Sequence, residues 1–203
     1  MTTLLALALV AYLIGSVSFA VIVSRAFALP DPRTYGSRNP GATNVMRTGK
    51  RPAALITLVG DGAKGWLAVL AAAYFAAAGA LETTVSVAAV AVVLGHAYPV
   101  FFGFQGGKGV STALGVLLAI NLYIALGTLA TWLIIFAFFR ISSLAALVAA
   151  VFAPFFTLIL YNAAHPYFIG VAIVSAFLVV RHQSNIRNLL AGTEGRLSRS
   201  KET

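Results

Sequence analysis

The chain has 203 residues, of which 60% are hydrophobic and only 9% are charged, and its mean hydropathy is +0.94. Because apolar residues make up about half of an ordinary soluble domain, this composition excludes a soluble protein and favours a membrane protein. Lys and Arg outnumber Asp and Glu by 14 to 5, and a net charge of +9 in such a chain indicates anionic lipid or phosphate substrates rather than nucleic acid. The chain has no Cys, which excludes disulfides, thiolate nucleophiles and Cys-ligated metals.

The first apolar stretch, residues 3–24, has the position of a signal peptide but not its charge pattern. Signal peptides begin with basic residues, whereas the first basic residue here is Arg25, which follows the apolar run. We therefore expect a retained first helix whose N-terminus lies outside the cell. A cleaved signal is the alternative.

Seven apolar stretches follow one another along the chain, and each is a candidate transmembrane helix. They cover about residues 3–24, 53–81, 84–102, 110–123, 124–140, 142–163 and 165–181. The sequence thus predicts an all-α, polytopic integral membrane protein of about seven transmembrane helices, with residues 1–203 forming a single membrane domain. The fourth stretch is short for a full crossing, so about five or six complete crossings with re-entrant segments are the alternative.

The basic residues predict the orientation of these spans. With seven spans and the N-terminus outside, every Lys and Arg lies on one side of the membrane, mainly in loops at about residues 25–52, 103–110 and 181–203. By the positive-inside rule this side is cytoplasmic, and so is the C-terminus. Because the outer connections are very short, we expect function on the inner side.

The first inner loop contains a stretch of small and polar residues, residues 36–47, which reads GSRNPGATNVMR. Its small residues let the backbone approach a ligand and offer N–H groups. Its hydroxyl, amide and guanidinium groups are donors suited to phosphate oxygens. The alternative is a polar loop of Gly and Pro turns with no role beyond topology.

The second inner segment, residues 95–112, reads GHAYPVFFGFQGGKGVST. Lys108 lies among glycines just before an apolar helix, so its ammonium, nearby backbone N–H groups and the helix N-terminus could face one anion. A nucleotide P-loop requires four residues between its glycines and Ser or Thr directly after Lys. Because Gly109 follows Lys108, we do not expect ATP binding.

A third polar segment, residues 182–195, follows the last apolar stretch and reads HQSNIRNLLAGTEG. A His, an Asn, an Arg and a Glu at a membrane surface could orient a substrate or move a proton, although a lone His is often only a hydrogen-bonding residue. Asp61 and Lys64 occupy adjacent positions near the inner end of the second span, where a simple ion pair is the slightly preferred interpretation. Ser142 begins another span at its inner end, where it could cap the helix or meet a phosphate.

Some enzyme classes are excluded by missing residues. The inner face offers too few carboxylates for a metal-dependent phosphatidyltransferase, so we expect no metal and no other cofactor. Glycerolipid acyltransferases that use a His followed five residues later by Asp are also excluded. The residues five after the three histidines are Phe101, Gly170 and Arg187.

Taken together, the three inner segments closely resemble the bacterial acyl-phosphate glycerol-3-phosphate acyltransferases, the PlsY family. The resemblance extends over nearly the whole chain. It includes residues 36–47, 95–112 and 182–194 and the positions Asp61, Lys64, Gly65, Arg140, Ser142 and Ser143. Two positions depart from the family pattern, because Arg38 stands where Gly is frequent and Ser184 where Asp is frequent.

The resemblance implies a seven-helix enzyme of the bacterial inner membrane, with its site facing the cytoplasm, that acts in phospholipid synthesis. It would transfer a fatty acyl group from acyl phosphate to the sn-1 hydroxyl of glycerol 3-phosphate, giving lysophosphatidate and inorganic phosphate. Acyl phosphate is a mixed anhydride with a good leaving group, so alignment and charge neutralisation suffice and no covalent nucleophile is needed. This would explain why the chain shows no catalytic triad.

On this hypothesis the polar residues of the three segments divide into groups. The group for the donor phosphate and the developing oxyanion is Ser37, Asn39, Asn44 and Arg47. The group for the glycerol phosphate is Lys108 with Gly103, Gly106, Gly107 and Gly109, and the further substrate contacts are Lys64 and Ser142. His182 and Asn185 would orient the reacting groups, and Glu194 would anchor the tail structurally.

A small transporter for a phosphate-bearing or other anionic metabolite is the main alternative from another class. Its loops would then form a phosphate-selective vestibule. Transporters usually show repeated halves and broken helices at the midplane, and no such repeat is visible in this sequence. A scaffold for lipid enzymes is a third reading, which the lack of an extended soluble segment disfavours.

Overall fold

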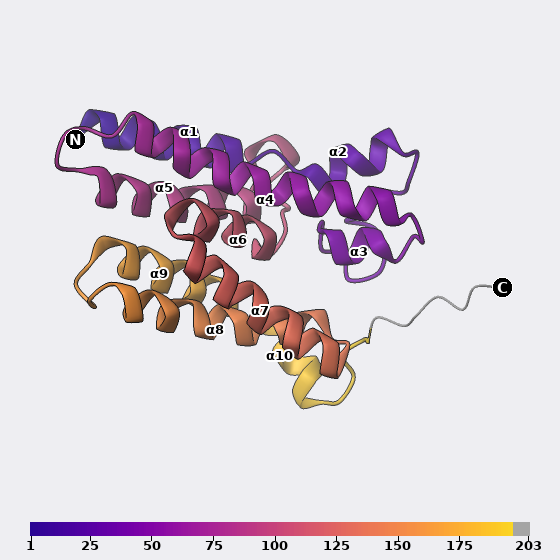
Figure 1. Ribbon diagram of the computed structural model, residues 1–203. Coiled ribbons are helices and arrows are strands. Elements are labelled where there is room, and N and C mark those ends of the chain that lie inside the picture. Colours follow the sequence, from indigo (N-terminus) through magenta and orange to yellow (C-terminus); the bar gives the residue numbers. More distant parts are fainter. Residues whose placement is uncertain (197–203) are drawn as a thin grey trace.

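The computed structural model describes residues 1–196, and over that range the regular structure is entirely helical (Figure 1). The last part of the third basic segment, residues 197–203, lies outside the described residues. In chain order the helices are α1 (Thr2–Gly15), α2 (Phe19–Ala26), α3 (Ala42–Met46), α4 (Arg51–Tyr74), α5 (Leu81–Ala97), the 3₁₀ turn η1 (Val100–Phe102), α6 (Val110–Ile120), α7 (Leu122–Phe139), α8 (Ser142–Leu160), α9 (Pro166–Arg181) and α10 (Gln183–Leu190). The predicted all-α fold is confirmed.

Each of the seven apolar stretches is largely helical, the first as the two helices α1 and α2, but not all are long enough to cross a bilayer. Five helical stretches among the described residues have the required length and apolar character: Thr2–Ala26, Arg51–Tyr74, Leu81–Phe102, Leu122–Phe139 and Ser142–Leu160. The pair α9 and α10, which is bent by 58°, is a sixth if counted as one span. With 11 residues, α6 is only about 16 Å long, roughly half of a bilayer core. The alternative of five or six full crossings therefore describes this fold better than seven.

The helices form two groups, with α6 between them. Figure 1 shows α1, α4 and α5 in one group and α7, α8 and α9 in the other. Glycines allow the backbones to approach closely within the first group, since a Cβ on Gly15 of α1 would meet the backbone of Val92 in α5. Small residues at such contacts are how membrane helices usually pack.

The short helix α6 is held against α4 by the same kind of contact. A Cβ on Gly65 would meet the backbone of Thr112, and a Cβ on Gly115 would meet the backbone of Gly62. The backbones of α4 and α6 therefore touch at two successive points. This contact fixes the start of α6, into which the loop containing Lys108 leads.

Replacing Gly115 by Ala should destabilise the protein by about 1 to 3 kcal/mol, because the added methyl group must push α6 away from the α4 backbone. Thermal unfolding in detergent would measure the change. The matched control is Gly127→Ala in α7, where the new Cβ would meet only the Phe156 ring, at 3.3 Å, which can shift. Equal melting temperatures for both variants would contradict this packing.

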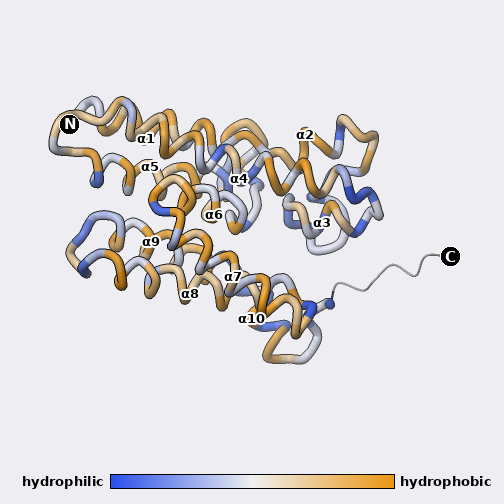
Figure 2. Tube along the Cα trace, in the orientation of Figure 1, coloured by the Kyte–Doolittle hydropathy of each residue, from blue (hydrophilic) through white to orange (hydrophobic). Residues whose placement is uncertain are grey.

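The first inner loop, the turn after α5 and the start of α8 gather at one end of the bundle. Arg33 donates from Nη1 to the carbonyl oxygen of Phe102 at 3.1 Å, which joins the first loop to the turn after α5. The Thr43 and Ser142 hydroxyls lie 3.2 Å apart and join the first loop to the start of α8. Figure 2 shows much of the hydrophilic chain around α3 and beside α10, at this same end. The orientation of this end in the membrane stays a prediction, as does the single membrane domain.

Candidate functional site

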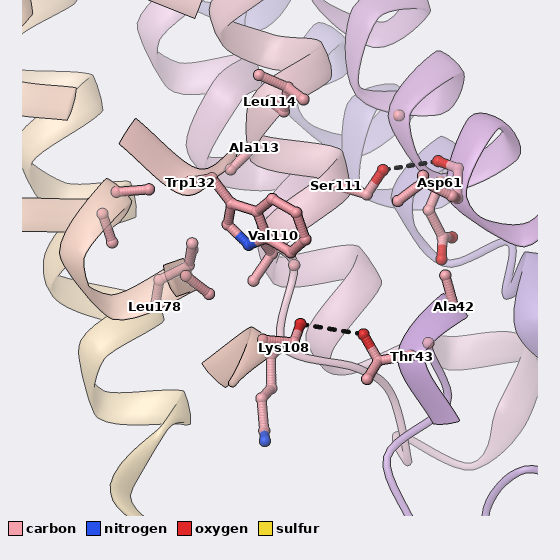
Figure 3. Close-up of a pocket in the computed structure, with 18 of the residues that line it drawn as sticks. Ala42, Thr43, Asp61, Lys108, Val110, Ser111, Ala113, Leu114, Trp132 and Leu178 are labelled. Carbon is pink, nitrogen blue, oxygen red and sulfur yellow. Dashed lines mark hydrogen bonds between the residues drawn. The ribbon is translucent and has the colours of Figure 1, made fainter. Parts of the chain in front are cut away.

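A cavity of about 1260 Å³ lies between α4, α6, α7, α8 and α9 and reaches the gathered loops. Its walls differ strongly in polarity. The polar wall includes Ser37, Asn39, Asn44, Arg47, Lys108, Ser142, His182, Asn185 and Glu194. The apolar wall includes Leu114, Leu117, Leu118, Leu129, Trp132 and Leu133. Figure 3 shows the Lys108 side chain pointing away from Trp132 and Leu114. The cavity can therefore hold a molecule with an anionic end and a long apolar end.

The first loop is organised around the side chain of Asn44, which is only 2% exposed. Its Nδ2 donates to the carbonyl oxygens of Pro32, at 2.8 Å, and Tyr35, at 3.2 Å. Its Oδ1 accepts from the backbone N–H of Ser37 at 3.1 Å. Gly36 has a φ of +57°, and a Cβ there would collide with Asn44 Oδ1, so the turn needs glycine. Asn44 therefore shapes the loop besides lining the cavity.

Arg47 follows α3 and carries its guanidinium to the polar wall. Its Nη1 lies 3.4 Å from Asn44 Oδ1, a long hydrogen bond that leaves most of its donors for other partners. An arginine can bind two phosphate oxygens through parallel N–H groups. Arg47 therefore has N–H groups available on the polar side of the cavity.

The ammonium of Lys108 is joined to the C-terminal segment by a chain of hydrogen bonds. Lys108 Nζ donates to Asn185 Oδ1, and Asn185 Nδ2 donates to Glu194 Oε1 at 2.6 Å. The same Glu194 oxygen accepts from the Ser143 hydroxyl at 2.6 Å. This chain brings the second and third inner segments together, as the sequence predicts.

Burial shifts the pKa of Lys108 and of Glu194, the two charged groups in this series of hydrogen bonds. Desolvation lowers the pKa of Lys108 below its ordinary value, and the Glu194 charge offsets part of this effect. Burial raises the pKa of Glu194, but hydrogen bonds from Ser143 and Asn185 outweigh it and hold the pKa below its usual range. An incoming phosphate would restore a counter-charge to Lys108.

His182 lies in the cavity wall at the junction of α9 and α10 and is 3% exposed. Its Nδ1 is 2.7 Å from the carbonyl oxygen of Leu178. Because a carbonyl can only accept, Nδ1 must carry the proton. In the neutral ring Nε2 is therefore an acceptor, which suits a residue that orients a substrate hydroxyl.

Four residues that the sequence suggests as substrate contacts do not line the cavity. Lys64 is 3% exposed, and its Nζ donates to the carbonyl oxygen of Val17 at 2.7 Å. Gly106 and Gly107 pack against His96, and Gly103, with a φ of +65°, lines a separate hollow near Arg33. Gly109 does line the cavity and, with a φ of +89°, starts α6 in a left-handed conformation. Gly103, Gly106 and Gly107 therefore shape the loop and do not line the cavity.

Other polar residues of the wall had no role assigned to them from the sequence. Thr43, Ser143 and Asn188 line the cavity in addition to the predicted residues. Asn188 could have been found, because it lies three residues after Asn185 and so on the same helix face. Among residues 1–196, no group of three or more His, Asp or Glu side chains is placed to hold a metal ion, and the expectation of no cofactor stays a prediction.

The sequence model for glycerol-3-phosphate acyltransferase matches residues 5–192 of this chain. The chain belongs to the glycerol-3-phosphate acyltransferase family. It is 59% identical over 196 residues to the glycerol-3-phosphate acyltransferase of Burkholderia ambifaria, covering 96% of this chain and 91% of that protein. It is 58% identical to the one from Cupriavidus taiwanensis, covering 96% of each.

Two crystal structures of PlsY, described as an integral membrane glycerol 3-phosphate acyltransferase, have the same fold. The glycerol 3-phosphate form is 36% identical and covers 96% of both chains, with a TM-score of 0.88. The lysophosphatidic acid form is 35% identical, with a TM-score of 0.86, and covers 96% of this chain and 95% of that one. The predicted PlsY resemblance and the prediction of an acyltransferase, rather than a transporter or scaffold, are confirmed.

Proposed function

We propose that the protein transfers a fatty acyl group from acyl phosphate to the sn-1 hydroxyl of glycerol 3-phosphate, giving lysophosphatidate and inorganic phosphate. The observation that carries this proposal is the cavity with one polar, cationic wall and one apolar wall. Acyl phosphate and lysophosphatidate each combine a phosphate with a fatty chain, so both match it. The related PlsY structures, one a glycerol 3-phosphate form and one a lysophosphatidic acid form, support the acceptor and the product.

Two phosphate-bearing substrates must approach each other in this site. Each carries about 1.5 to 2 negative charges near neutral pH if it titrates like phosphoserine. We assign the donor phosphate to Arg47 with Ser37, Asn39 and Asn44, and the acceptor phosphate to Lys108. Both cations line the same cavity, so together they can offset the repulsion between the substrates.

In the proposed reaction the sn-1 hydroxyl oxygen attacks the carbonyl carbon of acyl phosphate. The bond between that carbon and the phosphate oxygen breaks, an ester forms, and inorganic phosphate leaves. The hydroxyl proton goes to the donor's own phosphate, so the atoms and charges balance without a protein nucleophile. His182 and Asn185 orient the hydroxyl, and alignment of the two substrates supplies much of the acceleration.

The donor can be tested with purified protein in lipid cubic phase, supplied with glycerol 3-phosphate and either palmitoyl phosphate or palmitoyl-CoA. Lysophosphatidate and phosphate should form in equal amounts with palmitoyl phosphate, and no turnover is expected with palmitoyl-CoA. Turnover with palmitoyl-CoA alone would keep the acyltransferase class but overturn the donor. Absence of turnover with both, in folded protein, would contradict the proposed reaction.

We place this reaction at the bacterial inner membrane, with the polar wall facing the cytoplasm. The support is the gathering of the basic loops at one end of the bundle, together with the positive-inside rule. Cytoplasmic access suits the acceptor, because glycerol 3-phosphate is water-soluble and must enter from that side. The apolar wall would receive the acyl chain from the lipid phase.

A further inference from the structure

A cluster of buried polar side chains lies directly beneath the loop that carries Lys108. Asp61 and Lys64 from α4 are each 3% exposed, His96 from α5 is 7% exposed and Thr112 from α6 is fully buried. Charged groups inside a membrane protein are costly unless they are paired or functional. Asp61 and His96 also line the cavity, and Figure 3 shows Asp61 on the same side of it as Ser111. The reaction proposed above uses none of these four side chains.

The Asp61 carboxylate forms an ion pair with Lys64 and faces His96 beyond hydrogen-bond distance. Its Oδ1 lies 2.9 Å from Lys64 Nζ and 3.6 Å from His96 Nδ1. His96 Nδ1 also lies 3.2 Å from the Thr112 hydroxyl. Lys64 in turn donates to the carbonyl oxygen of Val17, at the break between α1 and α2. The cluster therefore joins α4, α5 and α6 to the break between α1 and α2.

His96 supports the loop from below. Its carbonyl oxygen accepts from the backbone N–H of Gly107 at 3.2 Å. A Cβ on Gly106 would collide with that carbonyl oxygen, and a Cβ on Gly107 would collide with His96 Nε2. His96 Nε2 therefore packs against the backbone of Gly107. Arg181 holds the loop from the other side, since its Nη2 donates to the Gly107 carbonyl oxygen at 3.1 Å.

We propose that Asp61 and His96 are positioning residues for the acceptor substrate. The Thr112 hydroxyl and the nearby Asp61 charge orient the His96 ring, His96 fixes the turn over residues 106–109, and this turn places the Lys108 ammonium beside Asn185. This inference rests on the proposed function, because it assumes that Lys108 binds the glycerol phosphate. A cluster that served packing alone would stabilise the protein without affecting one substrate more than the other.

The double variant Asp61→Asn with Lys64→Met distinguishes a positioning role from a packing role. It removes both charges together, so no unpaired ion is left in the interior. The KM for glycerol 3-phosphate should rise about tenfold or more, since a small misplacement of a binding group is costly. The KM for palmitoyl phosphate should change about twofold or less. The matched control is Thr57→Val in α4, which removes a fully buried hydroxyl that donates to Ala53 in its own helix. It should leave both KM values unchanged.

Equal KM values for wild-type protein and a folded double variant would overturn the positioning role. If the double variant does not fold, Thr112→Val carries the test, because it keeps the side-chain shape and removes the hydroxyl beside His96 Nδ1. It should raise the same KM, and an unchanged value would again overturn the inference. Wild-type protein without turnover on palmitoyl phosphate would instead contradict the proposed function, so the two failures are distinguishable.

Discussion

Replacing Lys108 by Ala should lower turnover of palmitoyl phosphate with glycerol 3-phosphate about 100- to 1000-fold. The variant loses a half-buried ammonium that lies at the polar wall and donates to Asn185. Without it, two phosphate groups meet with little to offset their repulsion. Release of lysophosphatidate measures the loss, and a thermal unfolding curve near that of wild type shows that the variant is folded. Turnover within about threefold of wild type would contradict the assignment, since one donor to a reacting anion is usually worth more.

The pH dependence of glycerol 3-phosphate binding should report the same ammonium. Burial lowers the pKa of Lys108, so in the free enzyme its charge is present at low pH and is lost as pH rises through a value below that of an ordinary lysine. The KM for glycerol 3-phosphate should therefore rise on the alkaline side. Lys108→Arg is the control, because a guanidinium stays charged and its KM should show no such rise. The same alkaline rise in both proteins would assign it to another group.

Much of the fold follows from the sequence, because apolar stretches and basic loops alternate along it. An even number of helices lies between successive segments, α4 and α5 and then α6 to α9, so the chain returns to the same end and residues 36–47, 95–112 and 182–195 meet there. The number of helices that cross the membrane completely was harder to predict from the sequence. The helix α6 is apolar enough for a span, but it ends after 11 residues, where Asn121 caps α7 through its side chain. Tertiary contacts, above all the one with α4, explain why so short a helix is stable.

The site was predictable where side chains carry charge and not where packing decides. The cations Arg47 and Lys108 have few roles open to them in a membrane protein, and both line the cavity. Lys64 has the same charge as Lys108, yet it turns inward because Asp61 lies one helical turn before it. The apolar wall could not be foreseen, because the sequence gives no sign of which leucines face a cavity and which face lipid.

Replacing Arg47 by Ala should lower turnover by about 100-fold or more, by removing the cation that we assign to the donor phosphate. Arg47→Lys should recover only part of this loss, because an ammonium cannot bind two phosphate oxygens through a planar fork. The same assay of lysophosphatidate release measures both variants. Under the proposed roles the KM for palmitoyl phosphate rises more than that for glycerol 3-phosphate, which is the reverse of the effect at Lys108.

The matched control for Arg47 is Arg38→Gly, which removes one positive charge from the same loop. Arg38 does not line the cavity, and its φ of +55° is a conformation that glycine adopts without strain. The variant should therefore keep wild-type turnover and unfold at the same or a higher temperature. Equal losses in Arg38→Gly and Arg47→Ala would mean that the loop acts through its net charge. A loss confined to Arg47 would mean that one guanidinium acts from one place, as the contacts around Asn44 indicate.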